Sequence, residues 1–163
     1  MKIDIHNHAD YHGHSVEKML ENMDKYGIDI TCLISWEAPQ HEYAPHTKYA
    51  FSPFSTMPVP FERCVAYKEK APNRFLLGFC PDPRQPDAIQ RLRAAVNLYD
   101  ISMCGELKLR MMYDNPDAIR LYRACGELNL PVLMHFDYEI PDKNTYPWPN
   151  YWYGGGIDRK SVV

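Results

Sequence analysis

The sequence lacks a long hydrophobic run and a strong excess of either charge. Its longest apolar runs are only a few residues, and Met1-Lys2-Ile3-Asp4 opens the chain without the apolar stretch of a signal peptide. We therefore expect neither export nor a membrane span, and we expect a cytoplasmic location. The formal net charge is −3, so there is no basic face to attract phosphates, and nucleic-acid binding is not expected.

Closely spaced cysteines are also missing. The 5 cysteines form an odd set without a close pair, which excludes a disulfide framework and a zinc ribbon. We expect them to be reduced thiols, packed mostly in the core; they are Cys32, Cys64, Cys80, Cys104 and Cys125.

Size and composition indicate a single globular domain. Hydrophobic residues make up 45% and charged residues 24%, a balance that excludes a disordered tail or a fibrous chain. A length of 163 residues allows one domain with a sizeable core, spanning 1–163, and is too short for two ordinary domains.

Short apolar runs alternate with stretches of helical period. This alternation predicts an α/β fold in which parallel strands are wrapped by helices. Five strands are expected, at residues 2–6, 30–35, 75–80, 104–110 and 131–136.

The stretches between the strands carry helix start and stop signals. Ser15 is a plausible N-cap, and Gly27 a stop signal, for the first helix. Further helices are predicted at 61–70, after Pro86-Asp87, and after the cap at Asn115, the last with Ile119, Tyr122 and Cys125 facing inward.

Two connections that follow strands are unusually long. Prolines and aromatic residues gather in 36–60 and 138–156. The loops after parallel strands share one rim, so we predict two ordered rim loops that cover a cavity. The alternative is that they pack on the end of the barrel or on a neighbouring subunit.

The first strand carries the sharpest chemical signal. Alternate side chains of a strand share a face, so Asp4, His6 and His8 are expected to project together. Ile3 and Ile5 would then face the covering helices. Two imidazoles about 7 Å apart at the Cα level can chelate one divalent cation. The alternative is a pair of solvated histidines in a loop.

Two later strands add candidate groups. His135 lies at the end of the fifth strand, where it can join His6 and His8 at the same rim, or serve as a hydrogen-bonded structural residue. On the fourth strand, Glu106, Lys108 and Arg110 alternate with leucines and so share a face.

Each charged group of the fourth strand has a candidate role. Burying such groups is costly unless they meet a metal, a partner or a substrate. Glu106 can be a further ligand or pair with Lys108, and Lys108 or Arg110 can hold a substrate carboxylate. A solvated strand end is the alternative for Arg110.

The first-strand His6-x-His8 motif and the segments 105–109 and 131–135, in this order, resemble the amidohydrolase superfamily. The specific resemblance is to the amidohydrolase-related (amidohydrolase 2) family, and it runs from residue 2 to about residue 156. It implies a (β/α)8 TIM barrel with a divalent metal, most often zinc. By this resemblance His6, His8 and His135 are metal ligands, with Glu106 and Lys108 as candidates only.

The chain also departs from this family. A complete barrel needs about 250 residues, so five strand-helix units correspond to the N-terminal portion only. The resemblance implies an eighth-strand aspartate as the proton-transferring base, and it has no counterpart here. Asp137 is the nearest carboxylate, but it lies on a different strand and is a candidate for substrate binding at most.

The resemblance implies a metal-dependent hydrolase. A metal-activated water would attack a C–N or C–O bond of a small, acidic substrate. A decarboxylase or hydratase of the same family is an alternative, in which the metal stabilises negative charge on substrate oxygens.

Two further readings remain open. A PHP-type phosphoesterase would use His12 and His14 in a multinuclear site, although the Ser-Asp-Gly that follows the first histidine pair in that family is absent. A truncated, non-catalytic chain would leave its outer strands unpaired, and would form a homo-oligomer or need a complementing chain.

Overall fold

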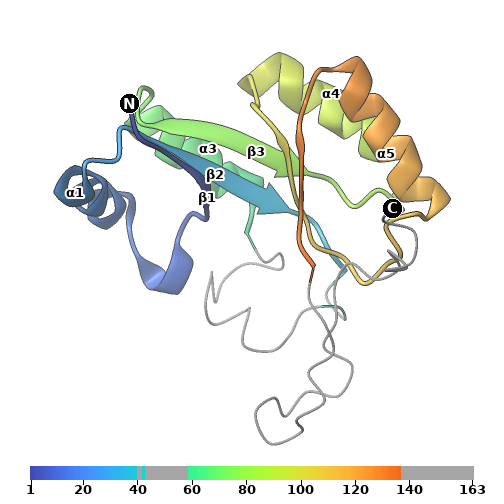
Figure 1. Ribbon diagram of the computed structural model, residues 1–163, viewed down its shortest axis with the longest axis horizontal. Helices are drawn as coiled ribbons and strands as arrows, with labels where there is room; N and C mark the ends of the chain where they lie inside the picture. The colour runs from blue at the N-terminus through green and yellow to red at the C-terminus, as the bar shows by residue number, and fades with distance from the viewer. Residues whose placement is uncertain (40–41, 43–58, 137–163) are drawn as a thin grey trace, which may run out of the picture.

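The structure is a computed structural model that describes residues 1–39, 42 and 59–136. Strands and helices alternate along the chain as predicted (Figure 1). The strands are β1 (Ile3–Asn7), β2 (Ile30–Trp36), β3 (Phe75–Cys80), β4 (Cys104–Leu107) and β5 (Val132–Met134). The helices are η1 (Tyr11–Gly13), α1 (Val16–Tyr26), α3 (Phe61–Lys70), α4 (Ala88–Tyr99) and α5 (Pro116–Glu127).

All five strands run parallel and follow one another in sequence order. β1, β2 and β3 form one ladder, and β4 pairs with β5. A bridge between Gly78 and Met103 joins the two ladders, and the Phe79 N–H donates to the Met103 carbonyl at 3.2 Å. Within the described residues, β1 and β5 each pair on one side only. These open edges are those predicted for an incomplete barrel.

The ends of β4 and β5 come earlier than the sequence predicts. β4 stops at Leu107, not at residue 110, and β5 spans three residues. The Tyr113 hydroxyl lies 2.6 Å from the Leu107 carbonyl oxygen and 2.7 Å from that of His135. The Leu107 carbonyl also accepts a hydrogen bond from the His135 N–H at 3.0 Å, so this last ladder bond and the Tyr113 hydroxyl lie together where the chain leaves the sheet at Lys108.

The first strand departs from the predicted alternation of its side chains. Ile3 and Ile5 do not pack under helices; they are 42% and 61% exposed. Asp4 instead lines a cavity beneath α1, together with Met19 and Met23. The register between β1 and β2 shifts between Asp4 and Asn7, and this irregularity breaks the period of two on which the prediction rested.

Local signals set the ends of α1 as predicted. The Ser15 hydroxyl accepts a hydrogen bond from the Lys18 N–H, and Gly27 ends the helix with a left-handed φ of 63°. Val16, Met19 and Met23 are buried.

Helix α5 begins as predicted, and of the three residues expected to face inward only Cys125 is fully buried. The Asn115 side chain accepts a hydrogen bond from the Asp117 N–H at 2.9 Å, with Pro116 in the first turn. The buried residues are Ala118, Leu121, Ala124 and Cys125. Ile119 and Tyr122 are only half-buried because the helix approaches the sheet through its alanines, which leaves the larger side chains on its flanks.

Removal of the α5 cap provides a test of these local signals. We expect Asn115→Ala to lower the free energy of unfolding by about 1 kcal/mol, because the Asp117 N–H loses its acceptor. Urea titration followed by circular dichroism measures the change. Asn97→Ala, at an exposed position of α4, is the matched control and should change the free energy of unfolding by less than about 0.5 kcal/mol. Equal losses in both variants would contradict the capping role.

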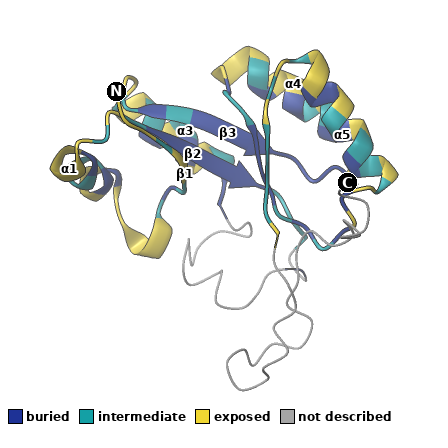
Figure 2. Ribbon diagram, viewed as in Figure 1, coloured by how far each residue is buried: buried dark blue, intermediate teal, exposed yellow. Residues whose placement is uncertain are grey.

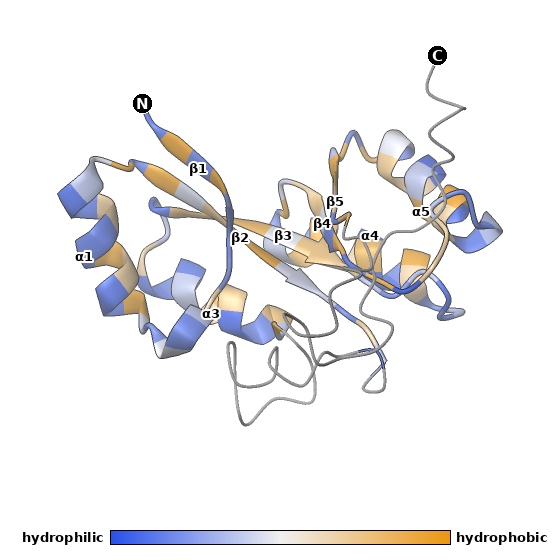
Figure 3. Cartoon of the chain, turned by 60° about the horizontal axis from the view of Figure 1, so that its bottom comes forward, coloured by the Kyte–Doolittle hydropathy of each residue, from blue (hydrophilic) through white to orange (hydrophobic). Residues whose placement is uncertain are grey.

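The hydrophobic core lies between the sheet and the helices. β2 and β3 are almost wholly buried, whereas the helices expose their outer faces (Figure 2). Figure 3 shows the apolar residues gathered along these central strands. All five cysteines are free and buried, which confirms their predicted place in the core.

Two glycines allow close approach between neighbouring strands of the sheet. A Cβ atom at Gly78 would lie 2.6 Å from Cγ2 of Ile34, and one at Gly105 would lie 2.8 Å from Cβ of Leu133. Both distances are shorter than real contacts allow, so these positions need glycine for the neighbouring residues to pack this closely.

Two sequence predictions fall largely on residues that are not described. Of the predicted rim loop 36–60, the structure describes 36–39, 42, 59 and 60, and the loop 138–156 lies outside the described residues. In the part of the chain that is described, no helix has both the length and the apolar character needed to cross a membrane.

Candidate metal centre

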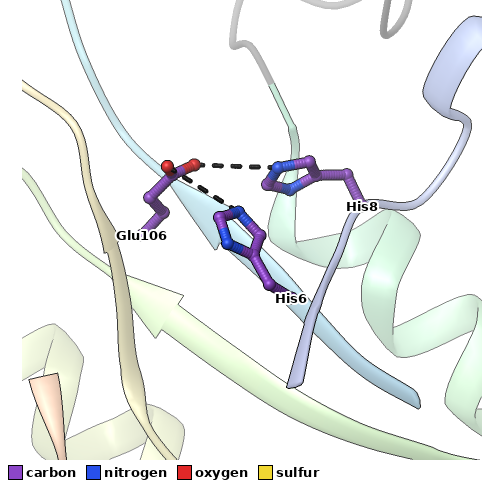
Figure 4. Close-up of side chains that lie close together, drawn as sticks. All are labelled: His6, His8 and Glu106. Carbon is purple, nitrogen blue, oxygen red and sulfur yellow. Dashed lines mark ion pairs between the residues drawn. The ribbon is translucent and has the colours of Figure 1, made fainter. Parts of the chain in front are cut away.

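Three side chains from β1 and β4 converge at the end of the sheet that carries the strand C-termini. His6 lies in β1, His8 directly follows it, and Glu106 lies in β4 (Figure 4). One ligand atom from each lies within 4.8 Å of the others. His6 Nε2 is 3.8 Å from Glu106 Oε1, and His8 Nε2 is 3.7 Å from Glu106 Oε2.

This convergence follows from the curvature of the sheet. β2 and β3 lie between β1 and β4. Three inter-strand spacings would separate β1 from β4 by about 14 Å in a flat sheet. The side chains can meet only because the strands bend round as in the wall of a barrel.

The orientation of His8 suits a metal ligand. Its Nδ1 lies 3.0 Å from the Ile34 carbonyl, which can only accept, so Nδ1 carries the hydrogen. Nε2 is then the basic nitrogen, and it faces Glu106. Burial lowers the pKa of His8 to about 4. The imidazole is therefore neutral near pH 7, which is the form that binds metal.

Glu106 carries a negative charge despite its burial. The residue is only 2% exposed. Burial by itself would raise its pKa, but the hydrogen bond with His135, the nearby His6 imidazole and the charge of Lys108 outweigh that effect and hold the pKa well below its usual range. A buried carboxylate thus faces two imidazoles.

His6 complements this carboxylate. The Glu106 carboxylate, 3.8 Å from His6 Nε2, raises the pKa of His6, and burial opposes the rise. The Glu106 carboxylate thus favours a positive charge at this point, carried either by a proton on His6 or by a bound cation. Two imidazole nitrogens and a carboxylate around one point are also a common donor set for zinc. The residues therefore fit a divalent metal.

The structure places His135 beside Glu106. Its Nδ1 lies 2.6 Å from Glu106 Oε1, and its backbone N–H donates to the Leu107 carbonyl at 3.0 Å. His135 does not belong to the group of three possible ligands. It contacts one of them, so it can orient the Glu106 carboxylate, and its role as a direct ligand stays a prediction.

The other predicted site residues are distributed around this group. Lys108 Nζ lies 5.5 Å from the centre of the Trp36 ring, and the charge of Lys108 lowers the pKa of Glu106. The Arg110 N–H donates to Glu42 Oε2 at 3.0 Å, so its backbone is fixed at the same rim. Because β4 ends at Leu107, Glu106, Lys108 and Arg110 do not share a strand face. Asp137 lies outside the described residues.

The histidines that suggested a multinuclear site stand apart. His12 lies in η1 and His14 just after it; both are exposed, and neither belongs to the group of possible ligands.

Trp36 is a site residue that sequence reasoning missed. It is 2% exposed, and its ring centre lies 5.3 Å from that of His8. It forms an apolar wall between His8 and Lys108. Its position at the end of β2, beside the other strand-end residues, was the available signal.

No protein-family model matches the chain, and no curated protein matches it in sequence. Several solved structures, however, match the chain in fold. A 2,6-dihydroxybenzoate decarboxylase from Rhizobium matches with a TM-score of 0.60 and 19% identity over 90% of this chain and 54% of that one. The same values hold for its complex with 2,6-dihydroxybenzoate. A probable 2-pyrone-4,6-dicarboxylic acid hydrolase from Acinetobacter baumannii, with citric acid bound, matches with a TM-score of 0.52 and 13% identity over 82% of this chain and 49% of that one.

These likenesses concern the fold. The chain spans about half the length of the structures it matches. Its parallel strands, in sequence order and alternating with helices, form an incomplete (β/α)8 barrel.

Proposed function

We propose that the chain holds the metal of a metal-dependent enzyme of the amidohydrolase superfamily, in the amidohydrolase-related family. The observation that carries the proposal is the meeting of His6, His8 and Glu106 across β1 and β4. The matched decarboxylase and hydrolase structures support it. We propose zinc as the ion, held by these three residues with His135 as ligand or support, since imidazole and carboxylate donors suit it.

The side chains around the centre have separate tasks in this proposal. A bound ion would supply Lewis-acid activation of water and of a substrate carbonyl. Lys108, and Arg110 beyond it, attract a substrate carboxylate, and the buried Trp36 ring excludes water from one side. His135 holds the Glu106 carboxylate in place.

Hydrolysis of a C–N or C–O bond and decarboxylation both fit this arrangement. The matched structures include one enzyme named for each reaction. Decarboxylation or hydration needs stabilisation of negative charge on substrate oxygens, which the cationic centre and Lys108 offer. Hydrolysis also needs a base to deprotonate water. A multinuclear phosphoesterase is less well supported, because His12 and His14 lie outside the ligand group.

Activity on two small acids tests the proposal. The zinc-loaded chain is assayed with 2,6-dihydroxybenzoate for release of carbon dioxide, and with 2-pyrone-4,6-dicarboxylate for ring opening by absorbance. We expect turnover of a small carboxylic acid that is lost on chelation and in Glu106→Gln. Zinc binding without turnover of these or related acids would favour the non-catalytic, truncated form.

The open sheet edges bear on the partners of the chain. Among the described residues, β1 and β5 each pair on one side only, and Ile3 and Ile5 are exposed along the open edge of β1. We expect self-association, or association with a chain that supplies further barrel units. Light scattering after gel filtration measures it, and a stable, compact monomer would contradict this part. The cytoplasmic location stays a prediction from the sequence.

A further inference from the structure

A cavity beside β1 is lined by a different set of residues from the candidate metal centre. It has a volume of about 180 Å³ and lies between β1 and α1, with the start of β2 as part of its wall. Its lining includes Asp4, Asn7 and Thr31 from the sheet side and Met19, Met23 and Tyr26 from α1. Figures 1 and 3 both show α1 beside the β1 edge of the sheet. None of His6, His8 and Glu106 lines this cavity.

A buried hydroxyl in the wall lacks a partner. Thr31 is 0% exposed, and its Oγ1 has no hydrogen bond among the described residues. Leaving a buried hydroxyl unpaired is unfavourable, and such groups in folded proteins normally have a protein, water or ligand partner. The hydroxyl thus marks a place for a polar group in the cavity.

An acidic group stands next to this hydroxyl. Asp4 and Thr31 are direct neighbours in the register of β1 and β2. The Asp4 carboxylate accepts one hydrogen bond from the His6 N–H at 3.2 Å and one from the Asn7 amide at 2.9 Å. A carboxylate offers about four acceptor positions, so capacity remains. Of the described residues, no lysine or arginine lines the cavity, and His14 is the basic side chain in its wall.

We propose that this cavity binds a small primary amine with a compact apolar body. The ammonium has three donors, enough to reach both Asp4 and the neighbouring Thr31 hydroxyl. The apolar body packs against Met19, Met23 and the Tyr26 ring. The face of the Tyr26 ring also attracts the positive charge of the ammonium. This site is separate from the proposed function and does not depend on it.

Binding of three probes of similar size tests the charge requirement. Benzylamine, benzyl alcohol and benzoate are titrated into the purified chain, followed by NMR chemical shifts and calorimetry. We expect saturable 1:1 binding of benzylamine, at least tenfold weaker binding of benzyl alcohol, and no binding of benzoate. Equal affinity for all three, or none for benzylamine, would overturn the proposal.

Substitutions of lining residues test where the amine binds. Asp4→Asn keeps the shape of the side chain. It should weaken the binding of benzylamine at least tenfold and leave the affinity for benzyl alcohol unchanged. Thr31→Val removes the hydroxyl and should weaken the binding of benzylamine several-fold. Glu21→Gln removes a charge from an exposed position of α1 that does not line the cavity, and it should leave the affinity unchanged.

A further variant separates this site from the metal centre. Amines can coordinate zinc, so the titration is repeated with His8→Ala and in the presence of a chelator. Benzylamine should bind both samples as it binds the wild type. Loss of binding in either would place the amine at the metal centre and overturn the proposal. If Asp4→Asn fails to fold, the comparison of the three probes on the wild type still decides.

Discussion

His8→Ala is expected to weaken zinc binding by about 100-fold or more, because it removes a neutral imidazole whose Nε2 faces Glu106. Loss of a hydrogen-bonding partner outside the ligand set typically costs about 10- to 100-fold, and loss of a ligand costs more. Isothermal titration calorimetry with a competing chelator measures the affinity. Metal analysis of the purified wild-type chain should give one ion.

His12→Ala is the matched control for this prediction. His12 is exposed in η1 and lies outside the group of ligands, so the affinity should not change. Two or three tightly bound ions per chain, with a loss in His12→Ala, would contradict a mononuclear centre and favour the phosphoesterase reading.

The same titration distinguishes the two roles of His135. If it acts by holding Glu106 through the 2.6 Å hydrogen bond, His135→Ala should cost about 10- to 100-fold in zinc affinity. A loss as large as that in His8→Ala would instead identify His135 as a ligand, as the family resemblance implies.

Arg84→Met is expected to lower the free energy of unfolding by about 3 kcal/mol. Arg84 forms a bidentate pair with Asp82 at 2.8 and 2.9 Å and reaches Glu42 at 2.5 Å. Asp82 and Glu42 are 3% and 4% exposed. Methionine keeps much of the length of the side chain but leaves two carboxylates buried without their cation, and urea unfolding measures the cost.

Arg93→Met provides the control for burial. Arg93 pairs with Glu127, and these side chains are 46% and 62% exposed, so the loss should be under about 1 kcal/mol. Similar losses in Arg84→Met and Arg93→Met would show that burial of the acceptors does not decide the effect.

The Arg84 pairs also bear on the rim of the barrel. Glu42 follows β2, Asp82 and Arg84 follow β3, and the Arg110 N–H after β4 donates to Glu42. The connections after three strands are thus tied together at the rim that carries the candidate metal centre. Loss of the Arg84 ion pairs should loosen Glu42 and, through it, the position of Arg110, a predicted substrate contact.

Local sequence patterns determined the order of the elements. Strand-helix alternation, the Ser15 and Asn115 caps and the Gly27 stop act within a few residues, so the sequence reveals them directly. His6 and His8 were found for the same reason, because their spacing along one strand is local. Where the period is interrupted, as between Asp4 and Asn7, the prediction of which side faces the helices was wrong.

Contacts between distant segments were decided only by the tertiary structure. Glu106 reaches His6 and His8 because β2 and β3 curve between them, and no local pattern encodes that curvature. The Tyr113 hydroxyl contacts the Leu107 carbonyl at the end of β4 and the His135 carbonyl just after β5. The sequence by itself therefore determined the elements and the candidate ligands, and only the folded chain decided which of those ligands meet, since their distances depend on how the whole sheet bends.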